Sequence, residues 1–368
     1  MNVSLPVLEN ENEVPSPALL IDWERVQENL RRMIAMAGGP ERLRPHVKTH
    51  KLPQIVEYQV SLGVTKCKCA TIAEAEMSAA AGARDVLLAA PLAGPNIGRF
   101  LKLQAGFPDV VFSALVDDAD ALEALNAAAV AAGQVAEVLV DLDIGQRRTG
   151  IVPEKAAALY RRLAALPGIR AGGLHAYDGH LHQRDLLERT AACDGAFAKV
   201  ETLKAELLAE GLPVPRVVAG GTPTFPIHAK REGVECSPGT CVLWDAGYEI
   251  NLPDLDFLAA AVLLTRVISR PGPDRICLDL GHKAVASEMP HPRVIFPSLP
   301  DARAVVHSEE HLVLETDRAA EFPVGTALYG IPWHICPTVA LHSAIFLVKN
   351  GRTVDEWLVK ARARRLTY

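Results

Sequence analysis

Two kinds of pattern alternate through the first 250 residues. Short apolar runs are separated by longer Ala-, Leu- and Glu-rich segments such as AEAEMSAAAG and ADALEALNAAAVAAG, whose composition favours helices. Gly82 and Gly133 close these two segments and suit helix C-caps. The apolar runs predict eight strands, at residues 43–48, 67–71, 85–91, 110–116, 137–143, 172–177, 216–221 and 236–244.

This alternation predicts the fold class. Strands that alternate with helices are typical of parallel sheets with right-handed crossovers, and eight of them fit an α/β (β/α)8 TIM-type barrel. A doubly wound open sheet is the alternative, although no Gly-x-Gly-x-x-Gly follows a strand. After about Leu252 the helical periodicity fades, and strand-like runs at 259–269, 275–279, 311–315 and 343–349 predict a C-terminal β domain.

The domain boundaries follow from this change of texture. We expect the barrel to span residues 26–249, and the β domain to combine residues 1–25 with 250–368. The run at 18–22 could be a strand of either part.

Composition narrows the class of protein. The net charge of -6, with 22% charged and 49% hydrophobic residues, is ordinary for a globular chain and gives no sign of a nucleic-acid or membrane partner. The N-terminus is too acidic for a signal peptide, and the run at 257–264 is too short to span a bilayer. Seven cysteines, an odd number in a long chain, argue against a disulfide framework. We therefore expect a cytoplasmic protein that acts on a small molecule.

The first candidate for chemistry is the run RPHVKTHK, in which Lys48 ends the first predicted strand. The C-terminal ends of barrel strands hold the chemistry in (β/α)8 enzymes. A partly desolvated lysine beside cationic neighbours can have a lowered pKa and attack an aldehyde. The alternative is an ordinary polar loop.

The chain has two glycine-containing turns in this region, one at the end of the seventh predicted strand and one within the eighth. Gly220-Gly221-Thr222 and Ser237-Pro238-Gly239-Thr240 can offer backbone N–H groups and hydroxyls to an anion. Phosphate sites of (β/α)8 folds commonly lie after these two strands, although two ordinary turns would look the same.

Polar residues also lie at the ends of the fifth and sixth predicted strands. Arg147 and Arg148 can donate to an electron-rich oxygen, and one of the two can equally be a surface residue. Three histidines and a tyrosine fall within residues 175–182, which is dense for a chain with 12 histidines, and histidine serves as general base or metal ligand. These four residues are His175, Tyr177, His180 and His182.

Near the end of the chain, His334 and Cys336 are two residues apart. In an extended strand both would point to the same side and could share a divalent ion, for which imidazole plus thiolate suits Zn, with Mn, Co or Mg left open. The alternative is a half-buried histidine and a core cysteine.

Together these motifs resemble the D-threonine aldolase and D-serine dehydratase family, which is related to the N-terminal domain of alanine racemase and comprises fold-type III pyridoxal-phosphate enzymes. The resemblance runs from PSPALLID at 15–22 to His334-x-Cys336, and RPHVKTHK is close to the cofactor-lysine signature of the family. It implies pyridoxal 5'-phosphate bound to Lys48 as a Schiff base, a barrel plus a β domain, and a homodimer.

Residue by residue, the resemblance implies further roles. Arg148 contacts the phenolic oxygen of the cofactor, and His175 and Tyr177 line its ring. His334 and Cys336 bind the divalent metal. The residues implied for the phosphate cradle are Gly221, Thr222, Gly239 and Thr240.

The resemblance leaves the reaction open between two lyases. Cys336 as metal ligand favours a dehydratase, whereas a histidine after Tyr177-Asp178-Gly179 (His180 or His182) favours an aldolase, because it can take the proton of a β-hydroxyl group. We weigh the histidines above the cysteine and predict retro-aldol cleavage of β-hydroxy-D-amino acids to glycine and an aldehyde. The alternatives are a D-serine or 3-hydroxyaspartate dehydratase giving a 2-oxo acid and ammonia, an amino-acid racemase, and a non-catalytic pyridoxal-phosphate carrier.

Overall fold

The computed structural model describes residues 8–368, and these residues form two compact units. We call residues 33–48, 52–239 and 363–368 the barrel unit, and the described residues up to 32 together with 49–51 and 240–362 the β unit. The helix α1 (Trp23–Ala37) begins in the residues of the β unit and ends in those of the barrel unit.

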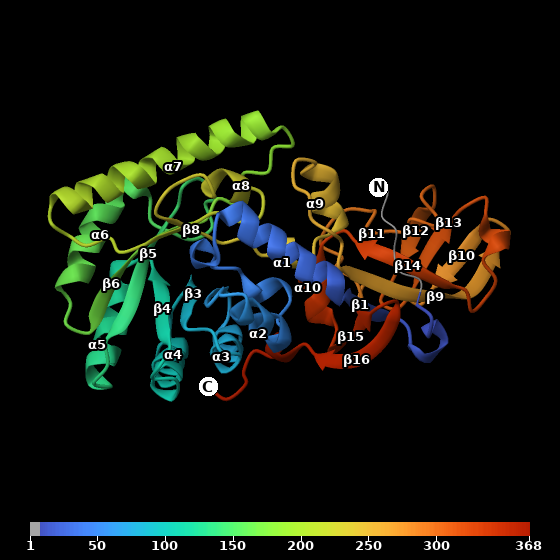
Figure 1. Ribbon diagram of the computed structural model, residues 1–368, viewed down its shortest axis with the longest axis horizontal. Helices are drawn as coiled ribbons and strands as arrows, with labels where there is room; N and C mark the ends of the chain where they lie inside the picture. The colour runs from blue at the N-terminus through green and yellow to red at the C-terminus, as the bar shows by residue number, and fades with distance from the viewer. Residues whose placement is uncertain (1–7) are drawn as a thin grey trace. The chain divides into compact units, whose positions relative to one another are not determined.

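The barrel unit is built on a curled sheet of seven parallel strands in the order β2 to β8 (Figure 1). This confirms the strand–helix alternation. The strands are β2 (Lys66–Cys69), β3 (Asp85–Pro91), β4 (Val111–Val116), β5 (Ala136–Leu142), β6 (Ile169–Ala176), β7 (Val217–Ala219) and β8 (Val234–Cys236). The helices are α2 (Pro53–Ser61), α3 (Ile72–Ala80), α4 (Pro95–Gly106), α5 (Ala119–Ala131), α6 (Pro153–Ala165), α7 (Leu186–Ala209) and α8 (Phe225–His228), with the short 3-10 helix η2 (Pro40–Arg42) before the sheet.

Residues 43–46 take the eighth position of the barrel. Leu43 bridges to Cys236 in β8 and His46 bridges to Lys68 in β2, so this segment lies between the two edge strands. The prediction of a full strand at 43–48 is wrong, because Pro45 has no N–H to donate and the chain turns into the 3-10 helix η3 (Val47–Thr49). The predicted strand at 236–244 is also wrong beyond Cys236, where Pro238 and Gly239 lead into η4 (Thr240–Val242).

Parallel strands covered by helices are buried on both faces, and the sequence reflects this. All seven residues of β5 are buried. Inside the barrel, Leu87, Leu115, Leu139 and Val218 form one apolar cluster. This apolar cluster therefore separates the polar side chains at the N-terminal ends of the strands from those at the C-terminal ends.

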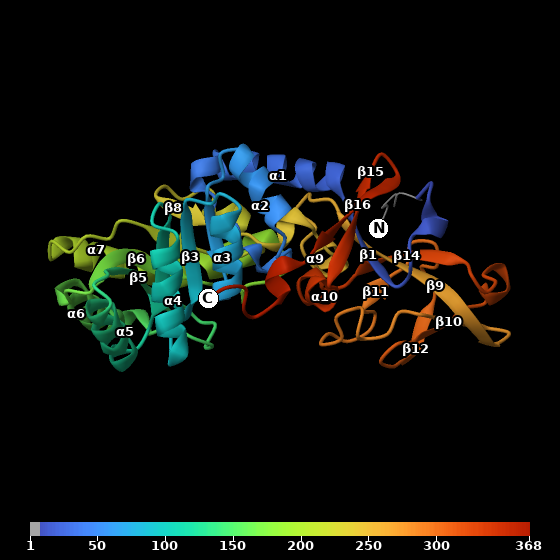
Figure 2. The same cartoon turned by 90° about the horizontal axis from the view of Figure 1, so that it is seen from below.

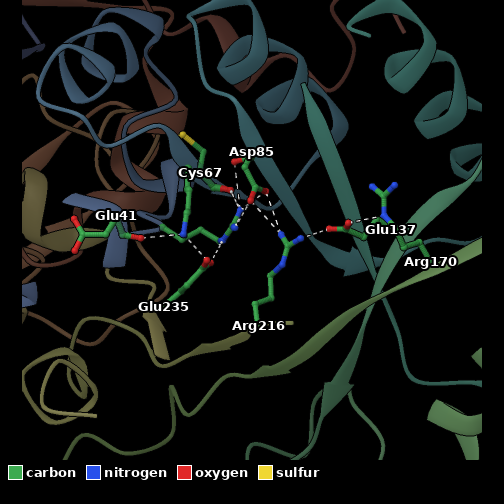
Figure 3. A network of polar contacts seen from close by, with 9 residues as sticks. Glu41, Cys67, Asp85, Glu137, Arg170, Arg216 and Glu235 are labelled. Carbon is green, nitrogen blue, oxygen red and sulfur yellow. Dashed lines mark hydrogen bonds and ion pairs between the residues drawn. The ribbon is translucent and has the colours of Figure 1, made fainter. Parts of the chain in front are cut away.

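At the N-terminal ends of the strands, a network of ion pairs closes the barrel (Figure 3). The fully buried Arg44 donates to Asp85 at 2.7 and 2.8 Å and to Glu235 at 2.7 Å. Arg216 pairs with Asp85 at 3.1 Å and also with Glu137. Each buried cation of this network thus has carboxylate partners within the chain.

The β unit contains a nine-stranded sheet, in the order β12-β13-β10-β9-β1-β15-β16, with β14 beside β9 and β11 beside β14. Figure 2 labels β1, β9, β10 and β14 of this sheet. The run at 18–22 is β1 (Ala18–Asp22), which pairs with β9 and β15 and so belongs to this unit. The other strands are β9 (Ala261–Gly272), β10 (Arg275–Leu278), β11 (Val294–Ile295), β12 (Arg303–His307), β13 (Leu312–Glu315), β14 (Ala327–Pro332), β15 (Ala344–Lys349) and β16 (Arg352–Leu358).

Short helices complete the β unit: α9 (Ala246–Asn251), α10 (Ile335–Leu341), η1 (Glu11–Glu13), η5 (Ala319–Glu321) and η6 (Lys360–Arg362). The seven cysteines of the chain are all free. Among residues 8–368, no helix combines the length and the apolar character needed to cross a bilayer.

Candidate active site

Three cationic side chains of the barrel unit surround the ring of Tyr177, which follows β6. The Nζ atoms of Lys48 and Lys68 lie 5.8 and 5.4 Å from the ring centroid, and Cζ of Arg148 lies 5.0 Å from it. They come from the segment after His46, from β2 and from the loop after β5. All four belong to the C-terminal side of the strands, where barrel enzymes carry their chemistry.

These cations lack the carboxylate partners that Arg44 has at the other end. Within residues 8–368, none of Lys48, Lys68 and Arg148 takes part in an ion pair. Three positive groups around one aromatic face favour a planar anionic ligand, because such a ligand would satisfy their charge while it packs on a ring. The residues present therefore fit a pyridine-ring cofactor that carries a phosphate and a phenolate.

His175, in β6, lies next to Lys68 of this group of cations. Its Nδ1 is 2.7 Å from Asp141 Oδ1, and Asp141 Oδ2 accepts a hydrogen bond from Thr149 Oγ1 at 2.9 Å. Burial, together with the charge of Lys68, lowers the pKa of His175 even though Asp141 acts in the opposite direction. The imidazole is therefore neutral, with Nδ1–H held by the carboxylate and the ring orientation fixed.

Lys68 is a site residue that the sequence analysis missed. Its Nζ lies 3.4 Å from His175 Nε2, and burial, followed by the charge of Lys48, lowers the pKa of Lys68 to about 7. The signal was present in the sequence, since a lysine within a short apolar strand is rarely buried without a purpose.

The glycine turn after β7 is packed too tightly for side chains. Gly220 has a φ of +77°, and a Cβ there would lie 2.6 Å from the ring of His228. A Cβ on Gly221 would lie 3.0 Å from the ring of Tyr177. Thr224 Oγ1 accepts from Gly221 N–H at 3.3 Å and donates to Asp178 Oδ1 at 2.7 Å, which fixes the turn.

The structure joins this turn to the second one predicted for phosphate binding. Thr222 Oγ1 accepts a hydrogen bond from Gly239 N–H at 3.2 Å. Ser237 Oγ is buried and has no hydrogen-bond partner among the described residues, so an anion here would satisfy it. Gly221, Thr222 and Gly239 therefore meet in the barrel unit, whereas Thr240 belongs to the β unit.

The two candidate bases after β6 are in different environments. His180 packs on Gly145 of the loop after β5, where a Cβ would lie 2.6 Å from His180 Nε2. Its Nδ1 is buried and has no partner among the described residues. His182 is exposed to solvent. The sequence could not separate the two, because the packing of His180 depends on a distant loop.

A buried cluster that the sequence did not predict lies behind the glycine turn. Asp178, Cys193 and His228 bring three potential metal-ligand atoms within 4.8 Å of one another. However, Arg231 Nη1 lies 2.7 Å from His228 Nδ1, and arginine can only donate, so the ring proton is on Nε2 and is donated to Asp178 Oδ2 at 2.7 Å. The cluster is thus a hydrogen-bonded support for the turn, and metal binding there would first require removal of that proton.

The predicted metal ligands lie in the β unit, but not on a strand. β14 ends at Pro332, His334 is the N-cap of α10, and Cys336 is in its first turn. The expectation of an extended His-x-Cys segment is therefore wrong, because Asp245 Oδ2 accepts from Ile335 N–H at 3.0 Å and starts a helix there.

His334 and Cys336 still contact each other, and their surroundings suit a divalent ion. The hydrogen bond and charge of His334 lower the pKa of the Cys336 thiol despite its burial, and Cys336 and Glu288 raise the pKa of His334 to about 9 although burial opposes this. Thr49 and Thr240 place their Oγ1 atoms 3.1 and 3.5 Å from Cys336 Sγ. A thiolate beside an imidazole whose Nδ1 contacts Glu288 is a donor set that fits a metal such as zinc.

Comparison with known protein families covers both units. The family described as "Alanine racemase, N-terminal domain" matches residues 21–245, and the family described as "Putative serine dehydratase domain" matches residues 260–348. The first match alone covers more than half of the chain.

Individual relatives agree with these matches over nearly the full length. The D-threonine aldolase of an Arthrobacter species is 33% identical over 95% of this chain and 93% of its own. The crystal structure of D-threonine aldolase from Filomicrobium marinum has a TM-score of 0.89 at 29% identity, covering 98% of both chains. The D-threo-3-hydroxyaspartate dehydratase of a Delftia species has a TM-score of 0.83 at 28% identity, covering 95% of this chain and 98% of its own, and is also solved as a His→Ala variant and as a Cys→Ala variant in a metal-free form.

The fold, the cations around Tyr177 and the similarity to these relatives all point to the same family. The chain belongs to the alanine racemase-like, fold-type III family of pyridoxal-phosphate lyases that includes the D-threonine aldolases and the 3-hydroxyaspartate aldolases and dehydratases.

Proposed function

We propose that this protein is a pyridoxal-phosphate- and divalent-metal-dependent aldolase that cleaves β-hydroxy-D-amino acids to glycine and an aldehyde. The observation that carries this choice is His180, a half-buried histidine with an unpartnered Nδ1 after β6. A retro-aldol reaction needs a base for the β-hydroxyl proton, and a dehydratase does not. The similarity to the two D-threonine aldolases supports the same choice.

In this proposal the barrel unit holds the cofactor. Lys48 carries it, Arg148 donates to its phenolic oxygen, and His175 and Tyr177 hold its ring. Gly221, Thr222, Gly239 and Thr240 would hold the phosphate. The N–H groups of Gly221 and Gly239 donate to Thr224 Oγ1 and Thr222 Oγ1 in this structure and would exchange these bonds for the phosphate oxygens. When bound, pyridoxal phosphate supplies an electron sink for the electron pair released at Cα of the substrate.

The β unit holds the metal, on His334 and Cys336. When bound, a divalent ion (Mn, Zn, Mg or Co) lowers the pKa of the β-hydroxyl group. Thr49 and Thr240 keep the thiolate oriented, and Glu288 fixes the ring of His334. The metal-free form described for the Cys→Ala variant of the Delftia dehydratase supports a cysteine ligand here.

The metal assignment has its own test. Replacement of His334 by alanine should lower the affinity for the metal at least about 100-fold, while the cofactor stays bound. Groups that only hydrogen-bond to a metal ligand already contribute about 10–100-fold, and loss of a ligand should cost more. Metal analysis of dialysed protein measures this, with His311→Ala as the control because His311 is an exposed histidine of the same unit. Full activity after chelation would contradict the metal assignment.

A dehydratase is the second candidate, and Cys336 favours it together with the Delftia relative. In that reaction Lys48 removes the proton at Cα, the β-hydroxyl leaves as water, and a 2-oxo acid and ammonia result. The two candidates differ in which bond at Cα breaks.

Product analysis decides between them. The purified protein, with pyridoxal phosphate and Mn²⁺ or Zn²⁺, receives D-threonine and D-serine separately. Glycine and acetaldehyde from D-threonine are expected, and a 2-oxo acid with ammonia would establish the dehydratase instead. Changing His180 to Asn should lower the aldolase rate about 10²–10⁴-fold, whereas His182→Asn, at an exposed residue, should have little effect.

We also propose a cytoplasmic homodimer. The free cysteines suit a reducing compartment. Light scattering of the holoprotein measures the subunit number, and a monomeric mass would contradict the dimer.

A further inference from the structure

The amine of Lys68 is the least expected group of the barrel unit. Lys68 is 2% exposed and lies within β2, where its N–H donates to Pro45 O at 2.9 Å. Buried lysines are rare and are normally paired with a carboxylate. Within the described residues Lys68 has no ion pair, and its hydrogen-bond partner is an imidazole.

This imidazole connects Lys68 to a carboxylate. Lys68 Nζ lies 3.4 Å from His175 Nε2, and His175 Nδ1 lies 2.7 Å from Asp141 Oδ1. Because Nδ1–H donates to the carboxylate, Nε2 keeps its lone pair and faces the amine. The three residues form a chain of amine, imidazole and carboxylate that runs from β2 through β6 to β5.

The charges around Lys68 balance its two protonation states. Burial acts first, and the positive charges of Lys48 and Arg148 also disfavour the ammonium form, whereas Asp178 and Asp141 favour it. Tyr177 covers the amine with its ring. The resulting pKa of about 7 makes both forms available at neutral pH.

We propose that Lys68 is a second proton-transfer residue of the cofactor site, coupled through His175 to Asp141. In the transfer the ammonium form of Lys68 gives one proton to Cα: an Nζ–H bond breaks with its electron pair left on Nζ, and a C–H bond forms. A second N–H of Lys68 donates to His175 Nε2, whose Nδ1–H is held by Asp141, and this contact orients the amine. The inference rests on the proposed function, because a lyase that releases glycine must return a proton to Cα.

The pH dependence of the cofactor absorption band of the holoprotein tests this. In the proposed site Tyr177 lines the cofactor ring, and Lys68 Nζ lies 5.4 Å from the centroid of the Tyr177 ring. A charge that changes so near the cofactor shifts its spectrum, so the wild type should titrate with a midpoint near pH 7. Lys68→Met stays neutral and Lys68→Arg stays charged, so both should lose this step. Lys66→Met is the matched control, since Lys66 lies on the same strand but pairs with Glu235 at 2.5 Å, and it should keep the step.

An unchanged midpoint in folded, cofactor-loaded Lys68→Met would overturn the proposal. If that variant does not fold, nitrogen NMR of the lysine Nζ groups of the wild-type apoprotein replaces it. One resonance with a midpoint near pH 7 supports the proposal, and midpoints that all lie above pH 9 overturn it. Neither readout depends on the products, so failure of the aldolase proposal is seen separately, in the product analysis.

Discussion

At the N-terminal ends of the barrel strands, buried cations are matched by carboxylates, whereas at the C-terminal ends cations surround the ring of Tyr177. Arg44 is 0% exposed and pairs with both Asp85 and Glu235. Asp85 and Glu235 hold the pKa of Arg44 above its ordinary value, although burial opposes them. Lys68 is also almost fully buried, and its pKa falls to about 7.

The difference between the two ends follows from what compensates the charge. A buried charge is tolerated when partners replace the lost water. At the N-terminal ends of the strands these partners are carboxylates of the chain itself. At the C-terminal ends we propose that a bound ligand supplies the matching negative charge. We therefore expect the network around Arg44 to contribute to the stability of the barrel, and the cations around Tyr177 to contribute to its chemistry.

Replacement of Lys48 by alanine should have the largest effect, and only on function. The variant should lose the absorption band of the lysine-bound cofactor and its lyase activity, because in the proposed site only Lys48 forms a covalent bond to the cofactor. Its free energy of unfolding should fall by no more than about 1 kcal/mol, since the change also removes a positive charge that acts on Lys68. Spectra and urea denaturation measure both, and a band that persists would contradict the cofactor assignment.

Replacement of Arg44 by methionine should have the opposite profile. It removes the fully buried cation that Asp85 and Glu235 share. Arg216 and Lys66 still pair with these partly buried carboxylates, so we expect the loss to lie at the low end of the about 3–5 kcal/mol that is typical of a broken buried pair. The folded fraction should keep the cofactor band and its normal products. Chemical denaturation gives the free energy, and a stable but inactive variant would show that the two ends are not independent.

Acid should weaken the ion-pair network around Arg44. Arg44 holds the pKa of Asp85 below 3.8 and that of Glu235 below 4.5, although burial alone would raise both. The unfolded chain takes up these protons at its ordinary pKa values while the folded chain resists, so stability falls as pH drops below about 4.5. Unfolding free energies between pH 6 and 3 measure the slope, and Arg44→Met should flatten it.

The smallest effect is expected where the network reaches solvent. The side chain of Arg170 is 59% exposed and pairs with Glu137 at 2.9 Å. Replacement by alanine should cost only about 0.2–1 kcal/mol, because water screens an exposed pair. The same denaturation assay measures it, and a loss as large as that of Arg44→Met would break the distinction between buried and exposed pairs.

Particular residues illustrate how far the sequence alone leads. The hydrophobic alternation predicts β3 at its observed bounds, Asp85–Pro91, because a doubly covered parallel strand leaves a continuous apolar run. The same rule fails at residues 43–48 and 236–244, where Pro45 and Pro238 interrupt the ladder. The sequence analysis did not predict β16, because this strand is mostly polar and exposed and an edge of this kind carries a weak pattern. It also did not predict β14, a mostly buried strand that contains Gly330 and ends at Pro332.

The candidate site divides in the same way. Lys48, Arg148, His175, Tyr177 and the glycine turns carry local signals, and their resemblance to a known family predicts the family, which the comparisons confirm, and its class of cofactor. The role of Lys68, the difference between His180 and His182, and the helical setting of Cys336 depend on contacts between residues far apart in the chain. Only the tertiary structure decides these, because burial and charge pairing, which set the pKa of a side chain, arise when distant strands meet.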